Sequence, residues 1–173
     1  AGEGKGSVDA IYDAAIGDAI AIAQSKFTAA AVNDLGKCFE KVDHQALLLR
    51  ASRVGFPQRI LGVALAMYRA GRCIQVNDAT AGPVFSNLGV AAGCTLATYL
   101  IRGFVVGAVD GYVAPYLTST TVFSDRLSIY VDDIMVQIMG SHIQGTAVRT
   151  VVVVKTLVQT FEQELGLPMA LEK

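Results

Sequence analysis

The stretch SIYVDDIMV, residues 128–136, decides the fold of this chain. Apolar runs at 127–130 and 134–138 flank a short acidic segment that contains Asp132 and Asp133. This arrangement predicts a tight β-hairpin with two adjacent acids in its turn. Because neighbouring residues of an extended chain point to opposite faces, the two carboxylates can take different roles.

A third acid follows an apolar run nearer the N-terminus. Residues 27–32 lead into Asn33 and Asp34, which predicts a buried strand with Asp34 at its C-terminal end. If this strand lies beside the hairpin, three carboxylates converge. Two carboxylates about 4 Å apart repel each other by about 4 kcal/mol at an effective dielectric of about 20, so such a site takes up a proton or binds a hard divalent cation.

Mg²⁺ is the hard cation that fits a site of this kind. It prefers one or two carboxylates, with water and phosphate oxygens as its other ligands. The chemistry that matches is two-metal phosphoryl transfer, in which one ion activates the attacking oxygen and the other stabilises the leaving group. On spacing alone, a polar hairpin turn with an unrelated Asp34 remains the alternative.

Helical segments fill most of the remaining chain. Apolar residues recur at helical spacing, or run almost without interruption, in five segments, and two short strands frame a turn. The predicted helices are 7–24, 44–53, 57–70, 94–109 and 143–165, and the predicted short strands are 72–77 and 84–88. Because helices alternate with strands and one hairpin is present, the expected class is α+β, an antiparallel sheet with helices packed on one face.

Composition restricts the possible functions. The chain has 173 residues, of which 53% are hydrophobic and 17% charged, and its net charge is −1. It can form a folded domain with a real core, and bulk positive charge alone cannot carry nucleic-acid binding. The apolar excess predicts a surface that meets a partner, another segment or a lipid. In the apolar window 89–109, Arg102 would cost about 2.5–3.5 kcal/mol in a bilayer, which favours a buried helix over a membrane span.

Cysteine usage and the N-terminus add two expectations. Cys38, Cys73 and Cys94 are widely spaced and form no metal-binding motif, which favours small buried thiols over a zinc site or a disulfide framework. The polar, Gly-rich N-terminal stretch has neither an initiator Met nor a signal peptide, so the chain is expected to be a piece of a longer polypeptide.

Six blocks occur along the chain in an order that is typical of one family. They are GKGSVDAIYDA (4–14), NDLGKCFEKVDH (33–44), LLLRASRVGFP (47–57), GVAAGCTLATYLI (89–101), SIYVDDIMV (128–136) and FEQELGLPMALEK (161–173). On these blocks the chain resembles the reverse transcriptase palm domain, most closely the non-LTR retrotransposon type. The resemblance implies a polymerase palm of split βαβ type over residues 1–173, with a remnant of the fingers at the N-terminus and no thumb.

The resemblance also implies the catalytic residues. Asp34, Asp132 and Asp133 match the carboxylates that hold two Mg²⁺ (or Mn²⁺) ions, with Asp133 as a weaker ligand or an orienting group. Lys173 matches a lysine proposed as the proton donor to the pyrophosphate. The implied activity is RNA-directed DNA polymerisation, which transfers a nucleotide from a dNTP to a primer 3′-hydroxyl.

Nucleotide-binding residues are implied in two places. The main-chain N–H groups of Leu35, Gly36, Lys37, Cys38 and Phe39 would hold the phosphates, with Gly36 allowing close approach. Phe39 matches the aromatic residue that meets the sugar 2′ group, and a core aromatic is its alternative. Gly93 lies in the Gly-rich turn that meets the template base and the nucleotide.

The implied partners are an RNA or DNA template-primer, the fingers and thumb of a longer polypeptide, and further protein subunits, whereas a membrane is disfavoured. A retrotransposon enzyme would act in the nucleus or cytoplasm. Ala92 stands where the family usually carries glutamine, and Glu40 where aspartate is more usual. The alternative is therefore an inactive palm fragment that serves as a structural or membrane-associated subunit of a larger assembly.

Overall fold

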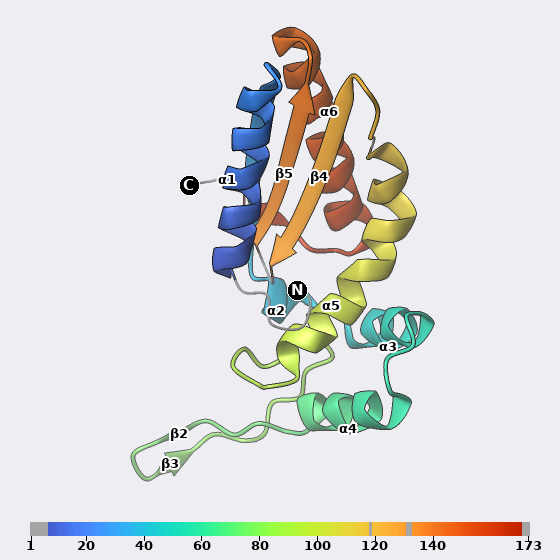
Figure 1. Cartoon of the computed structure of the whole chain (residues 1–173). Helices are drawn as coiled ribbons and strands as arrows, with labels where there is room; N and C mark the ends of the chain where they lie inside the picture. Colours follow the sequence, from blue (N-terminus) through green and yellow to red (C-terminus); the bar gives the residue numbers. More distant parts are fainter. Residues whose placement is uncertain (1–6, 118, 131–132, 171–173) are drawn as a thin grey trace. The chain divides into compact units, whose positions relative to one another are not determined.

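A computed structural model of the chain describes residues 7–117, 119–130 and 133–170 (Figure 1). The chain forms two compact units. We call Ala1–Gly36 together with Ala108–Lys173 the sheet unit, and Lys37–Gly107 the helical unit. The helical unit is thus an insertion into the sequence of the sheet unit.

The sheet unit is built on four antiparallel strands in the order β4-β5-β1-β6. Their bounds are β1 (Phe27–Leu35), β4 (Phe123–Tyr130), β5 (Asp133–Gly140) and β6 (Met169–Ala170). The predicted hairpin and the strand before it are confirmed, although all three strands are longer than predicted. β1 is not the buried strand that the sequence predicts, since Phe27 is 44% and Val32 72% exposed and Leu35 is its one buried residue. The sequence predicts Asp133 in the turn. In the structure Asp133 instead belongs to β5, because it pairs with Tyr130 of β4. Val131 and Asp132 lie outside the described residues.

One face of the sheet packs on α6 (Ile143–Gln159), which continues into a π-helical turn, η3 (Thr160–Glu164). Ile134, Val136 and Ile138 alternate along β5 and are 0% exposed. Val153 and Leu157 of α6 are equally buried. The run of valines at 151–154 favours strand locally. It is helical in the structure because tertiary packing overrides this local preference, and Val153 is the valine of the run that α6 buries.

The other face of the sheet contacts α1 (Ser7–Ala23), which runs beside the β4–β5 hairpin in Figure 1. Gln137 of β5 donates from Nε2 to Ala14 O at 3.0 Å and to Asp18 Oδ1 at 2.9 Å. Arg126 of β4 donates to Asp13 O at 2.7 Å. A Cβ on Gly17 would lie 2.7 Å from Gln137 Oε1, so the absence of a side chain permits this close approach.

The helical unit contains four helices and a two-stranded ribbon. They are α2 (Cys38–Lys41), α3 (His44–Arg53), α4 (Gln58–Arg69), β2 (Gln75–Val76), β3 (Ala79–Thr80) and α5 (Ala97–Ala108, whose last residue belongs to the sheet unit). Two short helical turns of the sheet unit follow, η1 (Val109–Val113) and η2 (Ala114–Tyr116). Asp43 caps α3 by accepting from Ala46 N–H at 2.7 Å.

Two predictions in the helical unit need correction. Of the strand predicted at 72–77 only β2 forms, and its partner β3 lies where the turn was predicted. The strand predicted at 84–88 is wrong, since that segment makes only isolated bridges, from Val84 to Arg72 and from Leu88 to Asp43. The helix predicted from residue 94 begins at Ala97. No helix in the described part of the chain has both the length and the hydropathy needed to cross a bilayer.

The α+β class with an antiparallel sheet is confirmed, whereas the expectation that the helices pack on one face is wrong, since α1 contacts one face and α6 the other. α1 and α6 lie on opposite faces of the sheet, because cross-strand partners share a face: Arg126 and Gln137 form one such pair on the α1 side, whereas Asp125, on the other side of β4, bonds to Arg149 of α6.

Candidate functional site

A transverse row of polar side chains lies at one end of the sheet. Asp34 of β1 pairs directly with Asp133 of β5, which pairs in turn with Tyr130 of β4. Side chains of directly opposed residues share a face, with their Cβ atoms about 4.5–5.5 Å apart. The structure therefore brings Asp34 to the hairpin, as the sequence predicts, and places it beside Asp133.

This row lies on the sheet face that α1 contacts, but further along it. Gln137, the contact of α1 on β5, is four residues from Asp133, or about 13 Å along a strand. Val32 precedes Asp34 by two residues on the same face and is 72% exposed. The acidic row is thus on an open part of the face, where a ligand can reach it.

The donor set suits a hard cation. Two carboxylates on neighbouring strands offer the oxygen ligands that Mg²⁺ prefers. Within residues 7–117, 119–130 and 133–170, no group of three or more His, Cys, Asp or Glu side chains is close enough to hold a metal ion. Asp132 and Lys173, both expected in the site, lie outside those ranges.

The turn after β1 differs from the expected phosphate cradle. Gly36 N–H donates to Pro168 O at 2.9 Å, so it is not among the donors open to a phosphate. Leu35 is buried and pairs with Met169 of β6. The short strand β6, which the sequence does not predict, is the reason. The residue with a left-handed backbone is Lys37, at φ 55°, and not Gly36.

The residues that follow belong to the helical unit. There Phe39 contacts the start of the segment 89–101, which we call the Gly-rich block. Cys38 is buried and opens α2, and Phe39 is half-buried. Val90 N–H donates to Phe39 O at 2.8 Å. Gly93 is exposed at φ +86°, and no atom lies within 4 Å of where its Cβ would be. Phe39 and the start of the Gly-rich turn are therefore neighbours within one unit.

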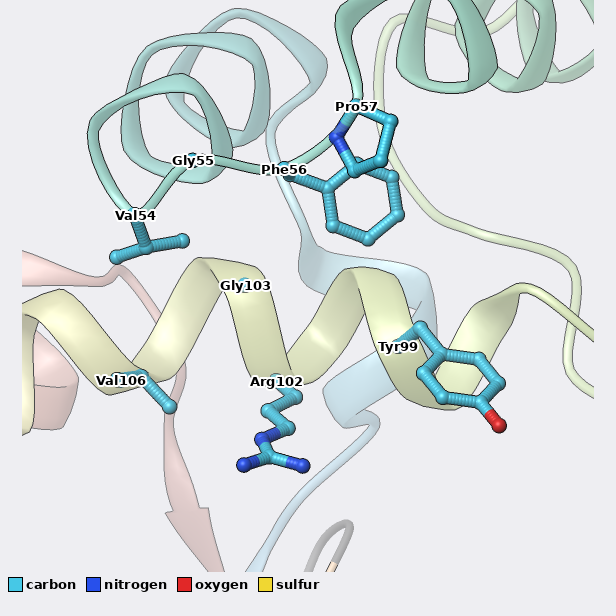
Figure 2. A pocket seen from close by; sticks show the side chains of 8 residues that line it. All are labelled: Val54, Gly55, Phe56, Pro57, Tyr99, Arg102, Gly103 and Val106. Atoms are coloured by element: carbon cyan, nitrogen blue, oxygen red, sulfur yellow. The ribbon is translucent and has the colours of Figure 1, made fainter. Parts of the chain in front are cut away.

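The structure also shows a shallow pocket in the helical unit (Figure 2). Its volume is about 380 Å³, and it lies between the α3–α4 connection and one side of α5. Its lining is mostly apolar, with one cation and one phenol: Val54, Gly55, Phe56, Pro57, Tyr99, Arg102, Gly103 and Val106. Tyr99 is 63% exposed, so the helix that the sequence predicts to be buried is open along this side.

A perturbed thiol, Cys94, lies within the Gly-rich block. The Tyr68 hydroxyl, followed by the Leu96 N–H, lowers the pKa of Cys94. Burial, and next Cys94, raise the pKa of Tyr68 above its ordinary value. Tyr68 Oη has no hydrogen-bond partner of regular geometry within the described chain, so we regard its contact with the thiol as weaker than a formed hydrogen bond.

The charge of the chain is divided unevenly between its units. Residues 37–107 hold 8 Lys and Arg against 3 Asp and Glu, a net charge of +5. The rest of the chain holds 6 against 12, a net charge of −6. The near-zero total hides a basic helical unit, a signal that was present in the sequence but becomes visible only once the units are known.

Comparisons with known proteins agree with this architecture. A sequence model described as "Reverse transcriptase (RNA-dependent DNA polymerase)" matches residues 7–173. A solved structure of apo telomerase from Candida tropicalis, truncated from its C-terminal domain, has a similar fold, with a TM-score of 0.66 at 14% sequence identity. That similarity covers 98% of this chain and 35% of the telomerase chain, so this chain spans about a third of that protein.

A search of curated protein sequences gave no match. The family assignment follows from the sequence model, which covers nearly the whole chain, and the telomerase structure supports the fold alone. Members of the family use divalent metal ions. This chain therefore belongs to the reverse transcriptase family of RNA-dependent DNA polymerases.

Proposed function

We propose that this chain is the palm of an RNA-directed DNA polymerase that transfers nucleotides from dNTPs to a primer 3′-hydroxyl. The observation that carries the proposal is the pairing of Asp34 with Asp133 on an open sheet face. Asp34 and Asp132 would hold the Mg²⁺ ions, with Asp133 as a weaker ligand or an orienting group. The ions, when bound, lower the pKa of the attacking hydroxyl and neutralise the leaving pyrophosphate.

The residues of the chain would otherwise bind and orient. Tyr130 shares the face of Asp133, and in this proposal it would pack beside the primer end. The N–H groups of Lys37, Cys38 and Phe39 remain as candidates for phosphate contact. Gly36 is removed from the expected set because its N–H bonds to Pro168 O, and Leu35 because it is buried and paired with Met169. Phe39 would meet the sugar, and Gly93 would meet the nucleotide or the template. Lys173 keeps its proposed role as proton donor on resemblance alone.

The charge of the helical unit supports a nucleic-acid substrate. Phosphate contacts from Lys and Arg supply most of the sequence-independent affinity for nucleic acid. A net charge of +5 in residues 37–107 provides such contacts, while the acidic sheet unit provides cation ligands. We propose an RNA or DNA template-primer as the substrate, together with other parts of a longer polypeptide as partners.

Binding of Mn²⁺ tests the carboxylate site directly, because it requires neither primer nor template. In electron paramagnetic resonance titrations, Asp34→Asn and Asp133→Asn should each lower Mn²⁺ affinity at least tenfold. The control Asp78→Asn, in the exposed β2–β3 turn, should bind Mn²⁺ as the unsubstituted chain does. Unchanged Mn²⁺ binding in both Asp34→Asn and Asp133→Asn would overturn the proposal.

Primer extension then tests the reaction. Either of the same two substitutions should lower the rate of nucleotide incorporation about 1,000-fold, equivalent to about 4 kcal/mol in the barrier. Asp78→Asn should retain the rate. Equal incorporation by Asp133→Asn and the unsubstituted chain would exclude Asp133 from the reaction.

A second candidate is a structural palm subunit without activity. The observation in its favour is an exposed apolar stripe on α1, where Ile11 is 68%, Tyr12 65% and Ile16 53% exposed. Such a stripe needs a covering partner. A chain that binds no Mn²⁺, and whose association with its longer polypeptide is lost in Ile16→Glu, would favour this candidate.

A further inference from the structure

Backbone pairing within the helical unit holds the start of the Gly-rich block. Gly89 N–H donates to Val42 O at 2.8 Å, and His44 N–H donates to Asn87 O at 3.1 Å. Val90 N–H completes the pairing with its bond to Phe39 O. The block is therefore attached to the backbone of Phe39 itself.

One buried side chain adds a further bond to this pairing. His44 is 1% exposed, and its Nε2 lies 2.6 Å from Gly89 O. A carbonyl oxygen can only accept, so the ring proton is on Nε2. Nδ1 has no hydrogen-bond partner within the described chain. The bond to Gly89 is thus the polar contact that the His44 ring makes there.

The backbone at Gly89 has no room for a side chain. Its φ is +84°, and a Cβ would lie 3.2 Å from Glu40 O and 3.4 Å from Phe39 O. The backbone of the block is therefore already in close contact with residues 39–40. The His44 bond holds the block at this closest approach.

A second buried ring stands behind His44. Tyr68 of α4 is 4% exposed, and the centroids of the two rings are 6.2 Å apart with the planes inclined at 34°. The hydroxyl of Tyr68 acts on Cys94, just after the Gly-rich turn. Side chains from α3 and α4 thus contact the block at Gly89 and at Cys94.

We propose that His44 is a positioning residue: its hydrogen bond to Gly89 O fixes residues 89–93 relative to Phe39, and so sets the space between them that would receive the sugar of the nucleotide. The consequence for nucleotides rests on the proposed function, whereas the consequence for the backbone does not. Loss of the donor should let the block move away from Phe39. The preference for dNTP over rNTP should then fall by a larger factor than kcat.

Hydrogen–deuterium exchange of the full chain tests the backbone claim without any activity. His44→Leu keeps the volume but removes the donor, and should speed exchange of the Gly89 and Val90 amides at least tenfold. His44→Gln keeps a donor at the ε position and should restore exchange to within threefold of the unsubstituted chain. Leu61→Ala, which truncates another fully buried side chain of the unit, controls for general loosening. Equal exchange at 89–90 in His44→Leu and Leu61→Ala would overturn the proposal.

Steady-state kinetics with dNTP and rNTP tests the pocket claim. His44→Leu should raise the KM for dNTP about tenfold, change kcat less than threefold, and lower the preference for dNTP over rNTP about tenfold. His44→Gln should recover both values, and Leu61→Ala should keep the preference. An unaltered preference in His44→Leu would overturn the pocket claim. Absence of nucleotide incorporation by the longer polypeptide, with its other parts present, refutes the proposed function, and the exchange experiment then decides the His44 claim alone.

Discussion

Asp125 and Arg149 form a largely buried ion pair between β4 and α6. The Arg149 Nη2 lies 2.6 Å from Asp125 Oδ2, and Nε donates to the same oxygen at 2.9 Å. The Asp125 side chain is 0% exposed and that of Arg149 22%. Arg149 also donates to Tyr116 O. The guanidinium therefore links the hairpin, α6 and the segment before β4 within the sheet unit.

Removing one partner of this pair should be costly. We expect Asp125→Asn to lower the free energy of unfolding by about 3 kcal/mol, because a partly buried guanidinium loses its counter-charge. Urea unfolding followed by circular dichroism measures this. Asp110→Asn, at an exposed position of η1, should change it by about 0.5 kcal/mol or less. A loss below about 1 kcal/mol in Asp125→Asn would show that water replaces the ion pair.

The Cys94 thiol gives a prediction about pH. Because the Tyr68 hydroxyl and main-chain N–H groups lower the pKa of Cys94, the thiolate forms at a lower pH than it does in an ordinary cysteine. Tyr68→Phe removes the largest cause, so the pH of half-maximal alkylation at Cys94 should rise. Iodoacetamide labelling from pH 6 to 10, with mass spectrometry of the Cys94 peptide, measures the shift. An unchanged profile would show that Tyr68 does not act on the thiol.

At the scale of elements, β5 and α6 meet at two glycines with little free space. A Cβ on Gly140 would lie 2.4 Å from Thr146 Oγ1 and 2.9 Å from the Phe123 ring. A Cβ on Gly145 of α6 would likewise lie 3.3 Å from the Phe123 ring. The end of β5 can approach the start of α6 only because residue 140 has no side chain.

Gly140→Ala should therefore destabilise the chain by about 1–3 kcal/mol through overpacking. The contrast is Gly62→Ala in α4, where no atom lies within 4 Å of the added Cβ. That substitution should stabilise the helix by about 0.5–1 kcal/mol, because alanine is the better helix former. Thermal unfolding of both variants should show shifts of opposite sign, and a stabilised Gly140→Ala would contradict this packing.

The elements differ in how far the sequence could predict them. The hairpin and α3 were predictable, because apolar runs flank an acidic turn and because Asp43 and Gly55 mark both ends of a helix. β6 was not, because two residues have no periodicity. Which side of α1 packs on the sheet could not be predicted, because its isoleucines are exposed, whereas Gly17 and Ala21 are buried. Small residues that permit close approach carry no hydrophobic signal.

The same limits apply to the candidate site. The positions of Asp34 and Asp133 at the ends of apolar strands could be predicted from the sequence, whereas their meeting was implied only by the family resemblance until the pairing of β1 with β5 was known. The loss of Gly36 N–H to Pro168 could not, because that bond joins residues far apart in the sequence. The bond from His44 to Gly89 could not be foreseen either, since a histidine at a helix start is ordinary until its partner is known.

At the scale of the whole molecule, the two units carry opposite net charge. Neutralising basic residues should therefore matter in one unit and not in the other. We expect the double substitution Arg53→Gln with Arg59→Gln to flatten the slope of log K against log salt for single-stranded RNA by about 1.4, because each phosphate that an arginine neutralises contributes about 0.7 to that slope. Both arginines are exposed.

Fluorescence anisotropy between 50 and 300 mM KCl would give this slope. The matched control is Lys26→Gln with Lys155→Gln, which removes the same charge from the sheet unit and should leave the slope unchanged. A flatter slope in the control than in the arginine variant would place the phosphate-binding residues on the sheet unit instead.

The pairing of β1 with β6 has a consequence for biosynthesis. In the sequence, residues 37–107 of the helical unit separate β1 from every other strand of its sheet. β1 is therefore synthesised long before any of its partner strands. Asp34 can pair only after Asp133, and then Ala170, have been synthesised. Such long-range closure is slow. During synthesis, β1 therefore lacks its last sheet partner until residue 170 has been made.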